Sequence, residues 1–171
     1  MLSLILGTAF VVLCLQASLK DITSFTIPNW INGALVILFI PAAIVGGIGW
    51  SVAGWHLLTA LIAFVLAFGL FSVGLFGGGD AKMIPAVLLW IGPNGILDFL
   101  FGMALGGGLL AFVLLSLRKA VPAEIAPAFA RQALDKESGV PYGIAITAGA
   151  LMAMSASPIL SDFLSQLANF N

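Results

Sequence analysis

The sequence predicts an all-α membrane protein in which a bundle of about six transmembrane helices forms one domain over residues 1–171. Hydrophobic residues make up 61% of the chain and charged residues 8%, with a mean hydropathy of +1.19; an average soluble domain carries roughly 25% charged residues. Long apolar runs favour helices, which satisfy their own backbone in lipid, and no alternating pattern typical of a membrane barrel occurs. The composition excludes a soluble globular domain and a disordered chain, and the net charge of −1 argues against a nucleic-acid-binding protein.

Six apolar runs define the expected helices, because a transmembrane helix needs about 20 mostly apolar residues. The runs are Leu2–Leu19, Trp30–Gly49, Trp55–Phe76, Met83–Leu97, Phe99–Leu117 and Pro141–Pro158. The fourth is the shortest, about 22 Å of helix at 1.5 Å per residue. We expect Pro85 in the first turn of that helix, where its missing N–H costs little.

The basic residues predict the orientation of these helices. All of them fall in the first, third and fifth loops: Lys20, Lys82, Arg118, Lys119, Arg131 and Lys136. The positive-inside rule makes that side cytoplasmic and places both termini outside. The long fifth loop holds an amphipathic stretch, residues 127–137, which we expect to lie as a short helix on the cytoplasmic interface or to act as a lid over the substrate.

Two acidic residues stand apart from the other five. Four of those five are expected to be solvated and one, Asp98, to cap a helix; the solvated ones are Glu124, Asp135, Glu137 and Asp162. Asp21 and Asp80 each lie at the expected cytoplasmic end of a transmembrane helix. Two carboxylates held close in a low dielectric tend to share one proton at neutral pH. Such a pair suits peptide hydrolysis, in which one member activates water and the other protonates the carbonyl oxygen; ordinary interfacial charges are the alternative.

Three glycines, Gly77 to Gly79, precede Asp80. Glycine permits positive φ and a close approach by another chain, so these residues leave room for an extended substrate beside Asp80, although a simple turn also favours glycine. The single cysteine, Cys14, is expected to be a buried small hydrophobe, and the single histidine, His56, to lie at the outer interface. Together they cannot supply the four or so ligands of a zinc site, so no metal or other cofactor is expected.

Three segments resemble the motifs of the type IV prepilin peptidase family. Asp21-Ile-Thr-Ser-Phe-Thr-Ile-Pro-Asn29 is similar to the first aspartate motif, including its Ile27-Pro28-Asn29 sequence. The second motif, Gly-x-Gly-Asp-x-Lys, is matched by Gly77, Gly79, Asp80 and Lys82. Val140-Pro-Tyr-Gly-Ile-Ala, with Pro141 and Tyr142, resembles the segment that opens the last helix of these enzymes.

The resemblance implies an aspartic endopeptidase in the cytoplasmic (inner) membrane, with its site facing the cytoplasm. It would cleave the short basic leader from a prepilin or pseudopilin precursor, using Asp21 and Asp80 as the catalytic pair. The pilus assembly machinery is a further implied partner. The remaining motif residues would bind substrate or support the site, with no defined chemical step for Lys82.

The first loop lacks the insert with paired Cys-x-x-Cys motifs that larger family members carry, which predicts a peptidase without methyltransferase activity. The compact form resembles the members that serve Flp-type pili. Three alternatives stay open at this point: an archaeal-type preflagellin peptidase, a small proton-coupled transporter that uses the same aspartates as relay groups, and a structural assembly subunit.

Overall fold

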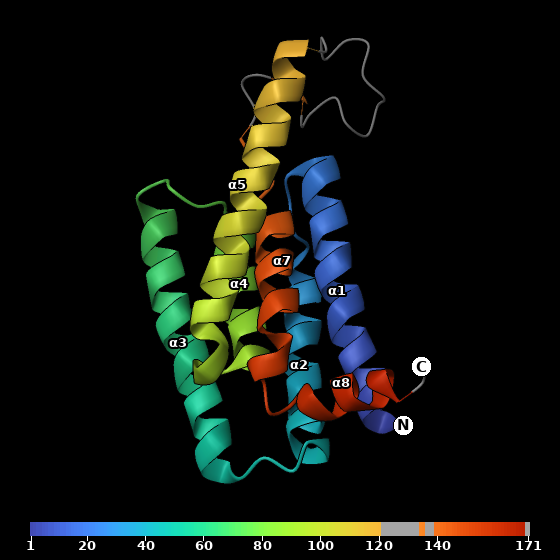
Figure 1. The fold of residues 1–171 in the computed structure, drawn as a ribbon. Helices are drawn as coiled ribbons and strands as arrows, with labels where there is room; N and C mark the ends of the chain where they lie inside the picture. Colours follow the sequence, from blue (N-terminus) through green and yellow to red (C-terminus); the bar gives the residue numbers. More distant parts are fainter. Residues whose placement is uncertain (121–133, 136–138, 170–171) are drawn as a thin grey trace.

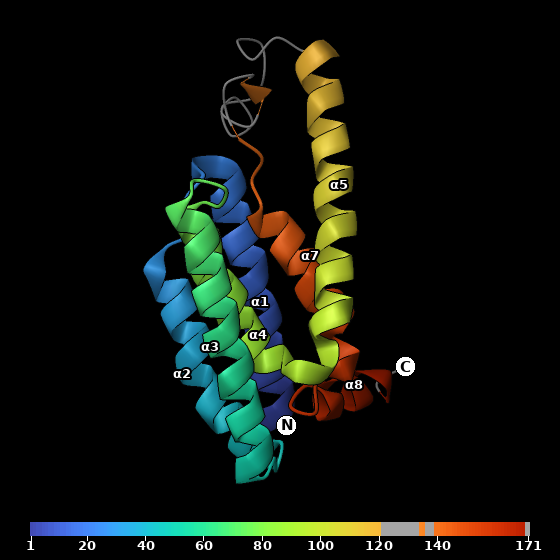
Figure 2. The same ribbon diagram turned by 90° about the vertical axis from the view of Figure 1, so that its left-hand side faces the viewer.

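The structure, a computed structural model, describes residues 1–120, 134–135 and 139–169. Every regular element in these ranges is a helix. The long helices run roughly side by side and form an elongated bundle (Figures 1 and 2). In chain order the α-helices are α1 Leu2–Ser24, α2 Asn29–Val45, α3 Trp50–Ser72, α4 Gly78–Ile91, α5 Ile96–Ala120, α7 Gly143–Ala153 and α8 Ser161–Ala168, and 3-10 turns occupy Pro93–Gly95 and Met154–Ala156.

Each of the six expected apolar runs overlaps a helix, but the helices do not all qualify as spans. Three are long and apolar enough to cross a membrane: Leu2–Ser24, Trp50–Ser72 and Pro93–Ala120. The pair Gly143–Ala156 and Ser161–Ala168, bent by 84°, would add a fourth if it forms one span, and Asn29–Val45 is apolar but shorter. The all-α membrane character is therefore confirmed, while six spans and the orientation of the termini stay predictions.

Helix α4 lies at the centre of the bundle, between α3, α2 and α7 (Figures 1 and 2). Its residues from Met83 to Ile91 are all buried. At its far end, the Trp90 indole is fully buried and donates a 2.8 Å hydrogen bond to the Leu35 carbonyl. The Phe10 ring lies 5.0 Å from it, centroid to centroid, with the ring planes tilted by 33°. This aromatic cluster ties α1, α2 and α4 together.

The start of α4 differs from the prediction. The helix begins at Gly78 rather than Met83 and ends at Ile91, because Gly92 adopts φ +74°. Pro85 therefore lies in the helix interior and not in the first turn. The fifth helix begins at Ile96, so Asp98 belongs to its first turn instead of the preceding loop.

His56 is predicted to lie at the outer interface, but the structure places it in the core. Its side chain is 1% exposed, and its Nδ1 donates to the Leu89 carbonyl oxygen at 2.8 Å, joining α3 to α4. The ring also fills the space beside Gly92, where a Cβ atom would lie 2.5 Å from it. The α3 helix begins five residues earlier than expected, at Trp50, and this extra turn puts the exposed Trp50 at the helix end and moves His56 inward. Cys14 is fully buried, as predicted.

The described basic residues gather at one end of the bundle, which we call the basic end. It carries the C-terminal ends of α1 and α5 and the N-terminal end of α4, with Lys20, Lys82, Arg118 and Lys119 (Figures 1 and 2). The opposite, distal end is crossed by α8, whose Phe163 packs against Gly7 of α1. The predicted helix 127–137 lies, apart from Leu134 and Asp135, outside the described residues, as do Arg131 and Lys136.

Candidate active site

The three motif segments meet at the basic end of the bundle. Asp21 lies in the last turn of α1, Asp80 in the first turn of α4, and Gly143 opens α7. The two aspartates are 59 positions apart in the chain, yet both are buried, at 5% and 8% exposure. Antiparallel α1 and α4 bring these ends together, so the described structure places the predicted pair in one region.

The Asp21 carboxylate is held by α7, a helix far away in the sequence that packs against α1. The Gly143 N–H, one of the unpaired donors at the start of α7, donates to Asp21 Oδ2 at 2.7 Å. A Cβ atom on residue 143 would lie 2.9 Å from the Cβ of Asp21, so only glycine allows this approach. The α1 helix ends three residues later at Ser24, and its C-cap residue Phe25 takes the left-handed conformation (φ 49°) and donates its N–H to the Asp21 carbonyl.

Asp80 lies at the third position of α4 and folds back on the N-cap residue, Gly77. Its carboxylate accepts a hydrogen bond from the Gly77 N–H, the geometry in which an acidic side chain stabilises a helix start. The other oxygen, Oδ1, is buried without a hydrogen-bond partner among the described residues. One carboxylate oxygen is thus fixed by the backbone, and the other is available for a proton or a ligand.

The two carboxylates interact electrostatically. Burial and, to a smaller extent, the negative charge of Asp21 raise the pKa of Asp80, and the hydrogen bond from Gly77 lowers it; together these effects bring the pKa to about 7. Asp80 precedes the apolar run Met83–Leu97 and lies outside the expected membrane-spanning segments. A carboxyl group with this pKa is about half protonated near neutral pH, as a shared-proton pair requires.

The glycines before Asp80 act through close packing and not through unusual backbone angles. Gly77 has φ −70°, and Gly78 and Gly79 already belong to α4, so the expected positive-φ loop is absent from this part of the described structure. A Cβ on Gly79 would lie 3.1 Å from the Cβ and 3.2 Å from the backbone nitrogen of Ile27, which is buried. This contact seats the Ile27-Pro28-Asn29 segment against the start of α4.

The other motif residues support the same junction. Pro28 is the N-cap of α2, and Lys82, which is exposed, donates to the Asn29 Oδ1 at 3.0 Å. In the helical geometry of α4, Lys82 thus pairs with α2 and not with Asp80. Pro141 is fully buried, and the Tyr142 ring lies 6.2 Å from the Phe76 ring, next to the Gly77 motif.

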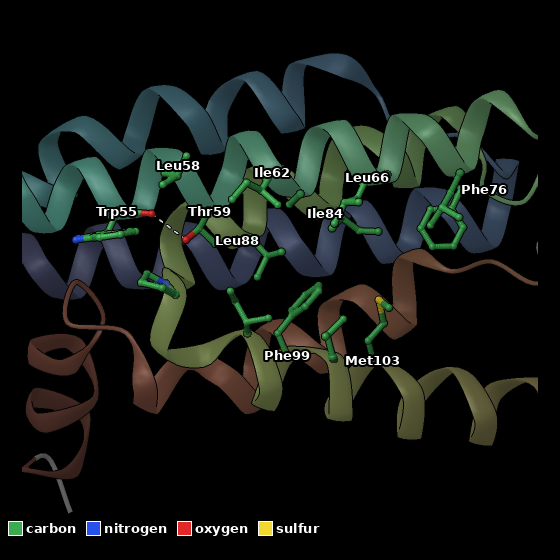
Figure 3. A pocket seen from close by; sticks show the side chains of 16 residues that line it. Trp55, Leu58, Thr59, Ile62, Leu66, Phe76, Ile84, Leu88, Phe99 and Met103 are labelled. Atoms are coloured by element: carbon green, nitrogen blue, oxygen red, sulfur yellow. Dashed lines mark hydrogen bonds between the residues drawn. The ribbon is translucent and has the colours of Figure 1, made fainter.

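An apolar groove of about 450 Å³ runs along the bundle toward this site. It lies between α3 and α5 with α4 as its floor, and extends from Trp55 near the distal end to Phe76, the residue before Gly77 (Figure 3). The α3 wall includes Leu58, Ile62 and Leu66, and the α5 wall Phe99 and Met103. The groove is partly open to the outside, and the Ile62 and Leu66 side chains in its α3 wall are exposed.

Three residues beside Asp21 were not singled out from the sequence: Ser18, Gly143 and Thr147. Ser18 lies three positions before Asp21 on the same helix face, and Gly143 follows the Pro141-Tyr142 pair, so spacing was the available signal. Their partners lie more than 120 positions away in the chain, which no local pattern encodes. Within residues 1–120, 134–135 and 139–169, no group of three or more His, Cys, Asp or Glu side chains is placed to hold a metal ion.

Comparison with protein families identifies the family of the chain. The model of the type IV leader peptidase family matches residues 8–112, a segment that includes Asp21, the Ile27-Pro28-Asn29 sequence and the whole motif from Gly77 to Lys82. Comparisons with curated proteins and with solved structures gave no match. The matched segment covers more than half of the 171 residues, and the chain belongs to the type IV leader peptidase family, a family of membrane proteases.

Proposed function

We propose that this protein is an aspartic endopeptidase that cleaves the leader from type IV (Flp-type) prepilins or pseudopilins at the cytoplasmic face of the inner membrane. Asp21 and Asp80 are the catalytic pair in this proposal. The observation that carries it is the meeting of two buried, electrostatically coupled carboxylates from separate helices at the basic end. The absence of paired cysteines from the sequence supports peptidase activity without methyl transfer, since Cys14 is the only cysteine.

The proposed reaction assigns a different role to each carboxylate. Asp80, with a pKa of about 7 and an unpartnered buried oxygen, carries the proton and donates it to the carbonyl oxygen of the scissile peptide. Ionised Asp21 accepts a proton from water as the water oxygen attacks the carbonyl carbon. When the C–N bond breaks, the leaving amine takes the proton from Asp21 and a hydroxyl of the intermediate returns one to Asp80. One water is consumed and both groups regain their starting states.

The apolar groove supports a substrate with a hydrophobic segment after its leader. Such a segment would lie against α3 and α5, with its cytoplasmic end reaching Phe76 and the Gly77–Asp80 turn. Helices shield their amides, so the residues around the scissile bond must become extended to reach the carboxylates. The contacts of Gly79 with Ile27 and of Lys82 with Asn29 hold the start of α4 against the start of α2, next to the proposed position of the scissile bond.

The test uses membranes that contain the enzyme and a co-expressed prepilin. Asp21→Asn and Asp80→Asn should each abolish the cleaved product, while Asp98→Asn, which changes an exposed aspartate at the distal end, should leave cleavage within about twofold of wild type. Normal cleavage by either site variant at equal membrane levels would overturn the catalytic assignment. Proton flux in liposomes that depends on both aspartates, without cleavage, would favour the transporter instead.

A further inference from the structure

Two buried hydroxyl groups lie between α1 and α7 beside the candidate site. Ser18 and Thr147 are 8% and 4% exposed, and their oxygens are 2.7 Å apart. We call them the α1–α7 hydroxyl pair. The surrounding interface consists mainly of apolar or small side chains, including Cys14, Ala17, Ile146 and Ala150. A polar pair of this kind is costly in an apolar bundle unless every group is satisfied.

The hydrogen atoms of the pair can be assigned from the distances. Thr147 Oγ1 lies 2.9 Å from the Cys14 carbonyl, which can only accept, so Thr147 donates to it. The Ser18 hydroxyl has one proton and three acceptors within reach: Thr147 Oγ1 at 2.7 Å, the Gly143 carbonyl at 3.0 Å and the Cys14 carbonyl of its own helix at 3.2 Å. The two shorter contacts join α7 to α1 within one turn of Asp21.

Gly143 is therefore held to α1 through both of its backbone polar groups. Its carbonyl faces the Ser18 hydroxyl, and its N–H donates to Asp21 Oδ2 at 2.7 Å. We infer that the α1–α7 hydroxyl pair positions Asp21 for its reaction, by fixing the start of α7 so that the Gly143 N–H orients the Asp21 carboxylate. This inference rests on the proposed function. Neither hydroxyl contacts the substrate; both act through Gly143.

The alternative is that the pair only stabilises helix packing, since interhelical hydrogen bonds between hydroxyl groups also hold membrane helices together. The two roles differ in what they change. Packing affects the amount and thermal stability of folded protein. Positioning affects kcat of the folded enzyme, while KM for the prepilin is little changed because substrate contacts are intact.

The experiment measures kcat and KM for a prepilin with purified, folded enzyme. Ser18→Ala and Thr147→Val should each lower kcat about tenfold with KM within about twofold, and Thr147→Ser should restore most of the activity. The kcat of the double variant should lie within about twofold of the kcat of the less active single variant, because the two hydroxyls act as a unit. The matched control is Ser157→Ala, which removes a buried hydroxyl bonded to the Trp90 carbonyl at the distal end.

The outcomes separate this inference from the proposed function. Wild-type kcat in Ser18→Ala and Thr147→Val, with Asp21→Asn inactive in the same assay, overturns the positioning role alone. A fall in kcat as large in Ser157→Ala as in Thr147→Val also overturns it, because the effect would then be general loss of packing. Normal cleavage by Asp21→Asn overturns the proposed function itself.

Discussion

Single alanine substitutions at the three consecutive glycines before Asp80 should have three different effects. A Cβ on Gly79 would lie 3.1 and 3.2 Å from Ile27 Cβ and backbone nitrogen, and one on Gly77 would lie 2.9 Å from Asp80 Oδ2. For a Cβ on Gly78, the nearest atoms belong to the Phe71 ring, at 3.4 Å or more, which is ordinary contact. The positions are adjacent, so the comparison controls for location in the chain.

The magnitudes follow from what must move. In Gly79→Ala the obstacle includes backbone, so overpacking should cost about 1–3 kcal/mol in the free energy of unfolding. If the same displacement disturbs the transition state, kcat should fall roughly 5- to 150-fold. In Gly77→Ala only the Asp80 carboxylate must shift, so kcat should fall with little change in stability. Gly78→Ala should keep kcat within about twofold and gain helix propensity of up to about 1 kcal/mol.

The assay combines prepilin cleavage kinetics with thermal unfolding of each purified variant. The expected pattern is loss of both activity and stability at Gly79, loss of activity at Gly77, and no loss at Gly78. Equal damage at Gly78 and Gly79, or an unchanged kcat in Gly77→Ala, would refute the reasoning from close contacts.

Three further predictions concern other parts of the site and core. Asp80, with a pKa of about 7, loses the proton that it donates as the pH rises through about 7, so kcat should fall over this range. At one pH unit above the pKa, kcat should be roughly one tenth of its low-pH plateau. A flat kcat profile from about pH 6 to 9 would contradict the role of Asp80 as the proton donor. Lys82→Met should lower the free energy of unfolding by less than about 1 kcal/mol, measured by thermal unfolding, because the bond to Asn29 is exposed; a greater loss would reveal another role. Trp90→Phe should destabilise by about 1–3 kcal/mol in the same measurement, since it removes the bond to Leu35 and part of a fully buried ring, and unchanged stability would show that the core adapts.

Scarcity of charge made much of the candidate site predictable. Asp21 and Asp80 stand out because few charged residues enter the apolar segments, and the structure brings the ends of their helices together. Each expected apolar run also overlaps a helix. These features depend on composition and on local sequence, which a single chain displays directly.

The remaining features depend on contacts between distant segments. His56 looked interfacial because it adjoins Trp55, yet the Leu89 carbonyl of α4 binds it in the core. The early start of α4 arises because glycines that favour a loop in isolation permit close packing against Ile27. In a membrane protein, moreover, apolar residues cover both lipid-facing and buried helix faces, so periodicity does not tell which face is inside.

The two candidate catalytic carboxylates also accept hydrogen bonds from backbone N–H groups at the starts of helices, Asp21 at α7 and Asp80 at α4. An asparagine side chain retains an oxygen that can accept the same N–H bonds, whereas alanine leaves a helix N-terminus unpaired at a cost of about 1 kcal/mol. Amide replacements are therefore the better choice for an inactive protein that keeps its native shape. Such a variant offers a means of capturing an uncleaved precursor for structure determination, with the enzyme held in the geometry in which it would react.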